Sequence, residues 1–227
     1  MAEVRTATRI GWIGLGKMGL PICLRLRRVG FPVSVPCRNA AAKQAATTNG
    51  FEVAHTIADA ATGADIIVSA ISDDKALLDI VFRAGGLKDC LAPGQVYVDI
   101  STASPDASGR VAEALELVTV KYVRAPVSGS AATAMQGALT ALVSGPSESF
   151  ATLPEFFAAF TRKAFLVGSG AEARYLKLAI NAMVGATSAL LAKSLMLARM
   201  GGMDIETIMN VGERDRLATD PVQAWAR

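Results

Sequence analysis

The sequence predicts an α/β protein with a doubly wound, mostly parallel sheet, followed by a long helix that starts an all-α domain. Apolar strand signals alternate with helical spacing from residue 9 to about 168. A glycine-rich turn follows the first strand, and helix-forming residues then run from Ala171 to Met200 with Gly185 as the one strong breaker. The 227 residues suffice for two domains, which we expect at 1–168 and 169–227.

The first strand is expected at 9–13, where a short and mostly apolar run is typical of a buried parallel strand. Apolar residues then recur at helical spacing from Met18 to Val29, Gly30 ends this helix, and a second strand follows at 31–35. The other expected strands are 66–70, 95–99, 122–127, 138–144 and 164–167. The other expected helices are 57–62, 73–82, 105–117, 147–160, 171–200 and 205–211.

The turn after the first strand matches the G-x-G-x-x-G pattern of dinucleotide binding. Its residues are Gly14, Leu15, Gly16, Lys17, Met18 and Gly19. Gly14 permits the tight turn, Gly16 lets a pyrophosphate approach the backbone, and Gly19 lets the helix pack closely on the strand. Because strand, turn, helix and strand follow in order, we expect a Rossmann-type cofactor site; a glycine turn without a ligand is the alternative.

The end of the second expected strand indicates which dinucleotide binds. NAD sites usually carry an acidic residue there for the ribose hydroxyls, but residues 35–39 contain none. Arg38, next to Asn39, stands where a guanidinium can pair with a 2′-phosphate, and Lys43 adds positive charge. We therefore expect NADP rather than NAD, the alternative being that Arg38 is a solvated loop charge.

Later loops are expected to reach the same site, because ligands of open α/β sheets lie beyond the carboxyl ends of the strands. Ile71 and Ser72 follow the strand 66–70, and Thr102 follows the strand 95–99. An ordinary helix cap is an alternative role for Thr102, and both roles are compatible.

Two further segments suggest a substrate site. Ser128, Gly129 and Ser130 are small residues after an expected strand, and their backbone N–H groups suit a carboxylate. Lys177 and Asn181 are four residues apart and therefore project from one face of the long helix. The neighbours of Lys177 are apolar, and burial lowers the pKa of a lysine towards that of a proton donor. The alternatives are an ordinary turn at Ser128–Ser130 and a solvated surface charge at Lys177.

Four segments together resemble the β-hydroxyacid dehydrogenase family, which includes 3-hydroxyisobutyrate dehydrogenase, tartronate semialdehyde reductase and glyoxylate/succinic semialdehyde reductase. They are the glycine turn with Met18, Asp99-Ile-Ser-Thr-Ala-Ser-Pro105, Ala125-Pro-Val-Ser-Gly-Ser130 with the later Gly137, and Lys177-Leu-Ala-Ile-Asn181. The resemblance implies an oxidoreductase that interconverts a small carboxylate-bearing aldehyde or keto acid and its hydroxy acid. It also implies that Lys177 gives and takes the proton, that Asn181 holds the substrate, and that Thr102 lies near the nicotinamide ribose.

The chain departs from the family pattern in three ways. Ser130 replaces a second glycine, and Arg124 stands where the family commonly has an aspartate. The family's helical domain also runs further, so we expect this chain to lack the C-terminal part of that domain. Two alternatives stay open: a cofactor-binding protein with little or no catalysis, and a reductase of another electrophile such as a cyclic imine.

The charge and composition of the chain exclude several classes of binding partner. The net charge is +3 without a basic stripe, and we expect neither a nucleic acid nor a membrane partner. Three scattered cysteines and the single His55 fit neither a disulfide framework nor a metal cluster. We expect a small carboxylate substrate, a cytoplasmic location and a homo-oligomer, either a dimer or a tetramer, formed through the long helix.

Overall fold

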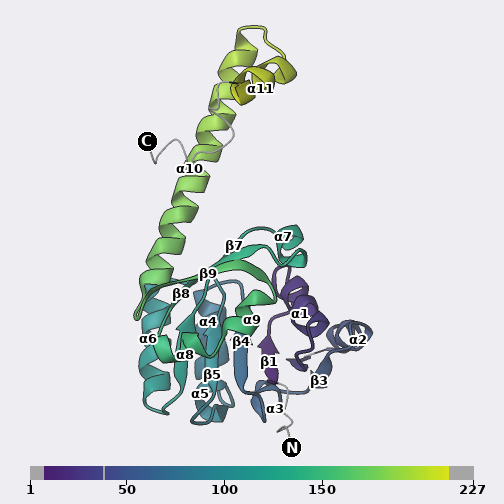
Figure 1. Ribbon diagram of the computed structural model, residues 1–227, viewed down its shortest axis with the longest axis vertical. Coiled ribbons are helices and arrows are strands. Elements are labelled where there is room, and N and C mark those ends of the chain that lie inside the picture. Colours follow the sequence, from purple (N-terminus) through teal and green to yellow (C-terminus); the bar gives the residue numbers. More distant parts are fainter. Residues whose placement is uncertain (1–7, 38, 215–227) are drawn as a thin grey trace, which may run out of the picture. The chain divides into compact units, whose positions relative to one another are not determined.

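The computed structural model describes residues 8–37 and 39–214, and the chain divides into two compact units. The first unit is Met1–Lys177 and contains the sheet; the second is Leu178–Arg227 (Figure 1). The first unit extends past residue 168 because the start of the long helix buries Ala173, Arg174 and Lys177.

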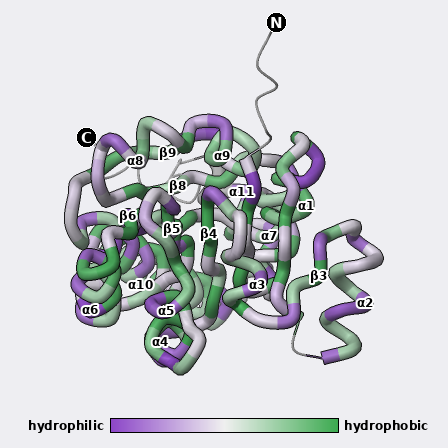
Figure 2. Tube along the Cα trace, turned by 90° about the horizontal axis from the view of Figure 1, so that it is seen from below, coloured by the Kyte–Doolittle hydropathy of each residue, from purple (hydrophilic) through white to green (hydrophobic). Residues whose placement is uncertain are grey.

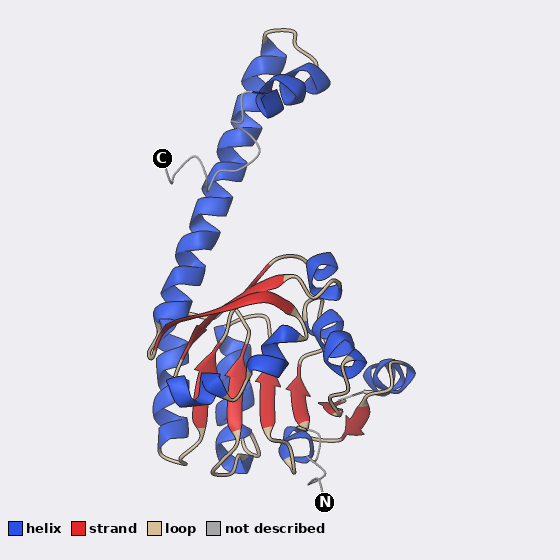
Figure 3. Cartoon of the chain, viewed as in Figure 1, coloured by secondary structure: helices blue, strands red, loops and turns tan. Residues whose placement is uncertain are grey.

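Nine strands of the described chain form one sheet, drawn as red arrows in Figure 3. They are β1 (Ile10–Ile13), β2 (Val33–Pro36), β3 (Glu52–Ala54), β4 (Ile66–Ser69), β5 (Val96–Asp99), β6 (Lys121–Arg124), β7 (Val127–Ser128), β8 (Leu139–Ser144) and β9 (Thr161–Gly168). The order is β3-β2-β1-β4-β5-β6-β8-β7, and β9 pairs with β8. Strands β1 to β6 pair in parallel, whereas β8 is antiparallel to β6 and β7. The predicted doubly wound, mostly parallel sheet is therefore confirmed.

The helices of the first unit cover both faces of this sheet. They are α1 (Gly19–Arg28), α2 (Ala40–Thr48), α3 (Ile57–Ala61), α4 (Asp74–Phe82), α5 (Leu87–Cys90), α6 (Pro105–Glu116), α7 (Ala131–Met135), α8 (Ser147–Ala151) and α9 (Pro154–Ala158). Successive residues of a strand point to opposite faces. Val68 of β4 lies in one core with Ile22 of α1. The preceding Ile67 lies in a second core with Leu77 of α4 and Val111 of α6. Figure 2 shows β4 as a hydrophobic segment between these layers.

Two sequence-based elements are wrong in detail, and both corrections involve proline. The expected strand 122–127 is two strands, β6 and β7, because Pro126 between them has no N–H to donate to a ladder. The expected helix 147–160 is two helices, and Pro154 is the first residue of α9, a position that proline favours. The residue pattern does not predict α2, β3, α5 and α7, because all but α2 are very short and α2 buries only Ala46.

The second unit, taken by itself, continues the long helix α10 (Glu172–Met200) from Leu178 and adds α11 (Ile205–Arg214). Both helices were expected from the sequence, and Gly201 and Gly202 separate them. Within the described residues, α10 is the one helix long and apolar enough to cross a bilayer by length and composition. The core helix of a soluble protein passes the same test, so one such helix is weak evidence for a membrane.

Candidate active site

In the glycine turn between β1 and α1, two positions have no space for a side chain. Gly14 has a φ of +104°, and a Cβ there would collide with the carbonyl oxygen of Ala70. A Cβ at Gly19 would collide with the carbonyl oxygen of Gly14, which also accepts a hydrogen bond from Trp12 Nε1 at 3.0 Å. Gly16 differs, because nothing lies within 4 Å of its Cβ position. The turn therefore offers an open backbone at the N-terminus of α1, where a phosphate group fits.

A hollow of about 360 Å³ lies beside this turn, at the carboxyl ends of the central strands. Its wall comes from the segments that follow β1, β4 and β5 and from β7 with the residue after it. The lining residues that the sequence singled out are Gly16, Lys17, Met18, Gly19, Ile71, Ser72, Thr102 and Gly129. The structure thus brings four distant segments together around one space, as expected for an open α/β sheet.

A second hollow of about 450 Å³ begins at the other half of the turn, where Gly14 and Leu15 contribute to its wall. The end of β2, the loop after β3 and helix α4 complete it, and Asn39 also lines it. Asn39 has a structural role as well, because its Oδ1 accepts from the backbone N–H of Ala42 at 2.8 Å and caps α2. A dinucleotide has two halves joined by a pyrophosphate, and two hollows on either side of a phosphate-binding turn fit that shape.

The structure does not place the two residues expected to recognise a 2′-phosphate in either hollow. Arg38 lies outside the described residues. Lys43 is an exposed residue of α2 and is not among the described residues that line either hollow.

Lys177 is the expected proton donor, and it lies in the first unit with only 9% of its surface exposed. Its Nζ donates a hydrogen bond to Ser128 Oγ at 3.1 Å, and burial lowers its pKa below the usual value. Ser128 precedes Gly129, which has a φ of +131° and lines the first hollow. The structure therefore brings two separately predicted substrate residues, Lys177 and Ser128, into contact near the cofactor space.

The two other expected substrate residues lie differently. Ser130 caps α7, with its Oγ accepting from the backbone N–H of Thr133 at 3.2 Å. Asn181 lies four residues after Lys177 in α10, is exposed, and belongs to the second unit.

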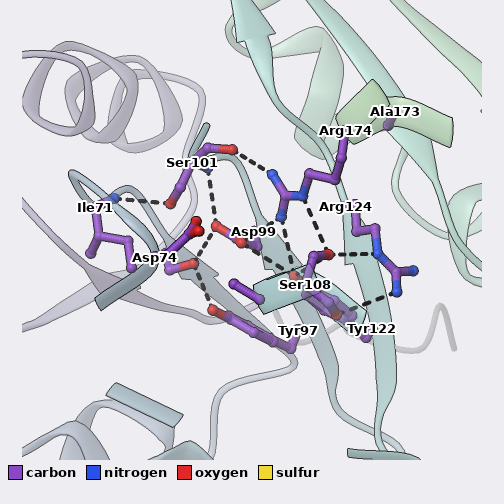
Figure 4. A network of polar contacts seen from close by, with 12 residues as sticks. Ile71, Asp74, Tyr97, Asp99, Ser101, Ser108, Tyr122, Arg124, Ala173 and Arg174 are labelled. Atoms are coloured by element: carbon purple, nitrogen blue, oxygen red, sulfur yellow. Dashed lines mark hydrogen bonds and ion pairs between the residues drawn. The ribbon is translucent and has the colours of Figure 1, made fainter. Parts of the chain in front are cut away.

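Sequence reasoning missed a buried polar network behind the first hollow (Figure 4). Arg174 of α10 forms an ion pair with Asp99, the last residue of β5, at 2.5 Å, and both side chains are fully buried. Arg174 also donates to the carbonyl oxygen of Ser101 and to the hydroxyl of Tyr122. The available signal was the place of Arg174 three residues before Lys177, which puts both on one helical face.

Charges in this network are set by burial and by the ion pair. Burial disfavours the charge of Arg174, but the Asp99 carboxylate more than offsets this, so the pKa of Arg174 lies above its usual value. Burial and the nearby carboxylate raise the pKa of Tyr122 to about 12 and the pKa of Tyr97 well above its usual value. Both tyrosines are therefore neutral hydrogen-bonding groups at neutral pH.

The fold and site define a dinucleotide-binding α/β protein, and comparison with known families specifies which one. Residues 9–168 match the model of the NAD binding domain of 6-phosphogluconate dehydrogenase. The chain belongs to this family of NAD(P)-binding domains.

Individual relatives agree with this assignment. The chain is 30% identical over 218 residues to an uncharacterized oxidoreductase from Shewanella frigidimarina, covering 96% of this chain and 73% of the relative. It is 28% identical over 216 residues to the cytokine-like nuclear factor N-PAC from Xenopus tropicalis, covering 95% of this chain. It spans only 40% of that relative's length.

Solved structures share the fold along most of the chain. A putative oxidoreductase from Mycobacterium avium has a TM-score of 0.86 at 28% identity, covering 96% of this chain and 78% of its own. Psf3 in complex with NADP⁺ and 2-OPP has a TM-score of 0.79 at 28% identity, with 89% and 72% covered. The 3-hydroxyisobutyrate dehydrogenase of Mycobacterium tuberculosis has a TM-score of 0.81 at 21% identity, with 91% and 70% covered, which shows a common fold. The family resemblance read from the four motifs is thereby confirmed.

Proposed function

We propose that this chain forms the cofactor site and carries the proton-transferring lysine of an NADP-dependent oxidoreductase. Its reaction interconverts a small carboxylate-bearing aldehyde or keto acid and the corresponding hydroxy acid. The observation that carries the proposal is the buried Lys177, hydrogen-bonded to Ser128 beside the hollow that the glycine turn borders. A lysine whose pKa is lowered by burial, next to a dinucleotide site, suits a carbonyl reduction.

Each group of residues has a role in this reaction. A dinucleotide held at the glycine turn Gly14–Gly19 would supply the hydride chemistry of this reaction in either direction. Lys177 gives a proton from Nζ to the carbonyl oxygen and takes it back from the hydroxyl in the reverse direction. Ser128 Oγ holds that amine through the hydrogen bond at 3.1 Å. The backbone N–H groups of Gly129 and Ser130 seat the substrate carboxylate, and Asn181 hydrogen-bonds the substrate.

The experiment compares NADPH oxidation with glyoxylate, succinic semialdehyde and a cyclic imine, using wild type and Lys177→Ala. Turnover with either aldehyde acid that disappears in the variant, while NADPH still binds, supports the proposal. Turnover that survives in Lys177→Ala contradicts the role of Lys177. Turnover with the imine alone contradicts the substrate class.

NADP is proposed over NAD because residues 35–39 lack an acid and Arg38 and Lys43 supply positive charge. Psf3, a structural relative at 28% identity, was solved with NADP⁺. Measuring kcat/KM with NADPH and NADH tests this preference, and a higher value with NADH contradicts it.

A second candidate is a cofactor-binding module with little or no catalysis. It is favoured by the similarity to N-PAC, whose name describes a nuclear factor rather than an enzyme. NADPH binding without turnover on any of the three substrates would support this candidate over the oxidoreductase.

The proposed partners are a small carboxylate substrate and a second copy of the chain, in a reducing cytoplasm. The described cysteines Cys23, Cys37 and Cys90 are free thiols. The proposal of a second copy of the chain rests on α10. This helix exposes large apolar residues in the second unit, and these include Val184, Leu190, Met196 and Leu197. Sedimentation of wild type and Leu190→Glu/Leu197→Glu tests the oligomer: a shift to monomer in the variant is expected, and a monomeric wild type contradicts it.

A further inference from the structure

We propose that Arg174 is a positioning residue that fixes Lys177 against the cofactor-binding loops. It does so by tying the first turns of α10 to the loop that follows β5. The inference rests on the proposed role of Lys177, and it assigns Arg174 no contact with substrate or cofactor.

All three nitrogens of the Arg174 guanidinium donate hydrogen bonds, and the acceptors lie in β5, in β6, in the loop after β5 and in α6. Its Nη2 donates to Asp99 Oδ2 at 2.5 Å and to the hydroxyl of Tyr122 at 3.1 Å. Its Nη1 donates to the carbonyl oxygen of Ser101, and its Nε reaches Ser108 Oγ at 3.4 Å. With 1% of its surface exposed, Arg174 is held from several sides at once, which leaves its helix little freedom to rotate or slide.

The carboxylate of Asp99, which pairs with Arg174, is itself held in place by several hydrogen bonds. Its Oδ1 accepts from Ser69 Oγ at 2.8 Å and from the backbone N–H of Ser101 at 3.0 Å. Its Oδ2 accepts from Tyr122 at 3.2 Å in addition to Arg174. Strands β4, β5 and β6 therefore all contribute to the position of one carboxylate. Figure 4 shows Ser101, Tyr122 and Arg174 around Asp99.

The network continues from this carboxylate into the wall of the cofactor hollow. Ser101 receives the Arg174 bond on its carbonyl oxygen, and its Oγ accepts from the backbone N–H of Ile71 at 3.0 Å. Ile71, Ser101 and Thr102 all line the first hollow. The same contacts thus fix the loops after β4 and β5 and the helix turn that precedes Lys177.

Stability alone does not require this arrangement. Replacing a buried ion pair by apolar residues of similar volume is often neutral or stabilising. Ser144 also anchors the start of α10, because its Oγ donates to the carbonyl oxygen of Gly170 and accepts from the backbone N–H of Ala173. What Arg174 adds is a direct link from the helix turn before Lys177 to the Ser101 loop.

The test separates positioning from stability by removing both charges. Single Arg174→Met leaves Asp99 buried without its cation, so its melting temperature is expected to fall. The double variant Asp99→Asn/Arg174→Met removes both charges, and an asparagine still accepts from Ser69 and Ser101; its melting temperature is expected to return close to wild type. Arg162→Met, at an exposed position of β9, is the matched control.

Three readouts follow in the double variant. Turnover is expected to fall by about tenfold or more, because small misplacements of a reacting group are costly. The NADPH dissociation constant is expected to change by less than about threefold, because the Ser101–Ile71 contact remains. Reductive methylation of Lys177 at alkaline pH, followed by peptide mass spectrometry, is expected to be faster by about fivefold as the amine loosens.

The methylation readout needs no turnover, so it still decides the inference if wild type proves inactive and the proposed function fails. Wild-type methylation and turnover in a stable double variant would overturn the positioning role. If the double variant does not fold, Arg174→Lys replaces it, since lysine keeps the charge without the fork of donors. Faster methylation of Lys177 in Arg174→Lys supports the inference, and an unchanged rate overturns it.

Discussion

The glycine turn and the Arg174–Asp99 network hold the two ends of the same site by opposite means. The turn works because side chains are absent: Gly16 leaves its backbone open, and Gly14 and Gly19 have no space for a Cβ. The network works because side chains are present and fully paired, with both charged groups buried. The cofactor end is thus specified by local backbone geometry, and the lysine end by contacts between residues 75 positions apart.

This difference has a physical consequence. A backbone turn tolerates a change only where there is empty space, so neighbouring glycines respond very differently to the same substitution. A buried polar network is destabilised mainly when one partner is removed. The charge that is left buried without its partner lowers stability by more than the intact pair raises it. The following experiments test the two descriptions, from the largest expected effect to the smallest.

Gly19→Ala should be the most damaging change, with a loss of unfolding free energy on the order of 5 kcal/mol, because its Cβ meets the backbone of Gly14. Gly16→Ala is the matched control, since its Cβ meets no protein atom. The control should keep its stability and still bind NADPH more weakly, because the methyl group fills the space for the pyrophosphate. Chemical denaturation and fluorescence titration measure both effects, and equal stability of the two variants would contradict the account of the turn.

Asp99→Ala should cost about 3–5 kcal/mol of stability, because it leaves the Arg174 guanidinium buried without its anion. Asp106→Ala, at an exposed position in the first turn of α6, should change stability far less. Urea denaturation of the two variants gives the comparison. Similar losses in both would mean that the buried pair has no special role.

Ser128→Ala should lower turnover by about fivefold, the loss expected for one hydrogen bond of about 1 kcal/mol that holds Lys177 Nζ. Stability should hardly change, because Ser128 is only partly buried and its backbone is untouched. Steady-state kinetics measure the effect. Unchanged turnover would show that Lys177 does not need this contact.

The last and smallest of these expected effects is a slight gain in stability near neutral pH in Lys177→Met, because methionine has no charge to bury. Burial lowers the pKa of Lys177 in the folded chain below its unfolded value, so the charged lysine reduces stability at lower pH. That penalty fades as the pH rises through the folded pKa and is gone above the unfolded pKa, so the gain should shrink in alkaline solution. Unfolding curves from pH 7 to 10 test the direction, and a gain that grows with pH would contradict it.

The comparison also explains which parts of the site could be predicted from sequence. The glycine turn, the strand ends and Lys177 are each recognisable within a few residues, because they depend on local spacing. Arg174 is not, because one arginine on an apolar helix is usually a solvated charge. Only its position opposite Asp99 makes it part of the site.

The sequence by itself determined the fold class, the glycine turn and the order of the longer strands and helices, since periodicity and glycine placement act over short distances. The tertiary structure decided that Pro126 divides a predicted strand, that Ser128 contacts Lys177, and that Arg174 pairs with Asp99. These contacts join residues that are distant along the chain. Which distant side chains meet depends on sheet order and register, and those emerge only when the whole core packs.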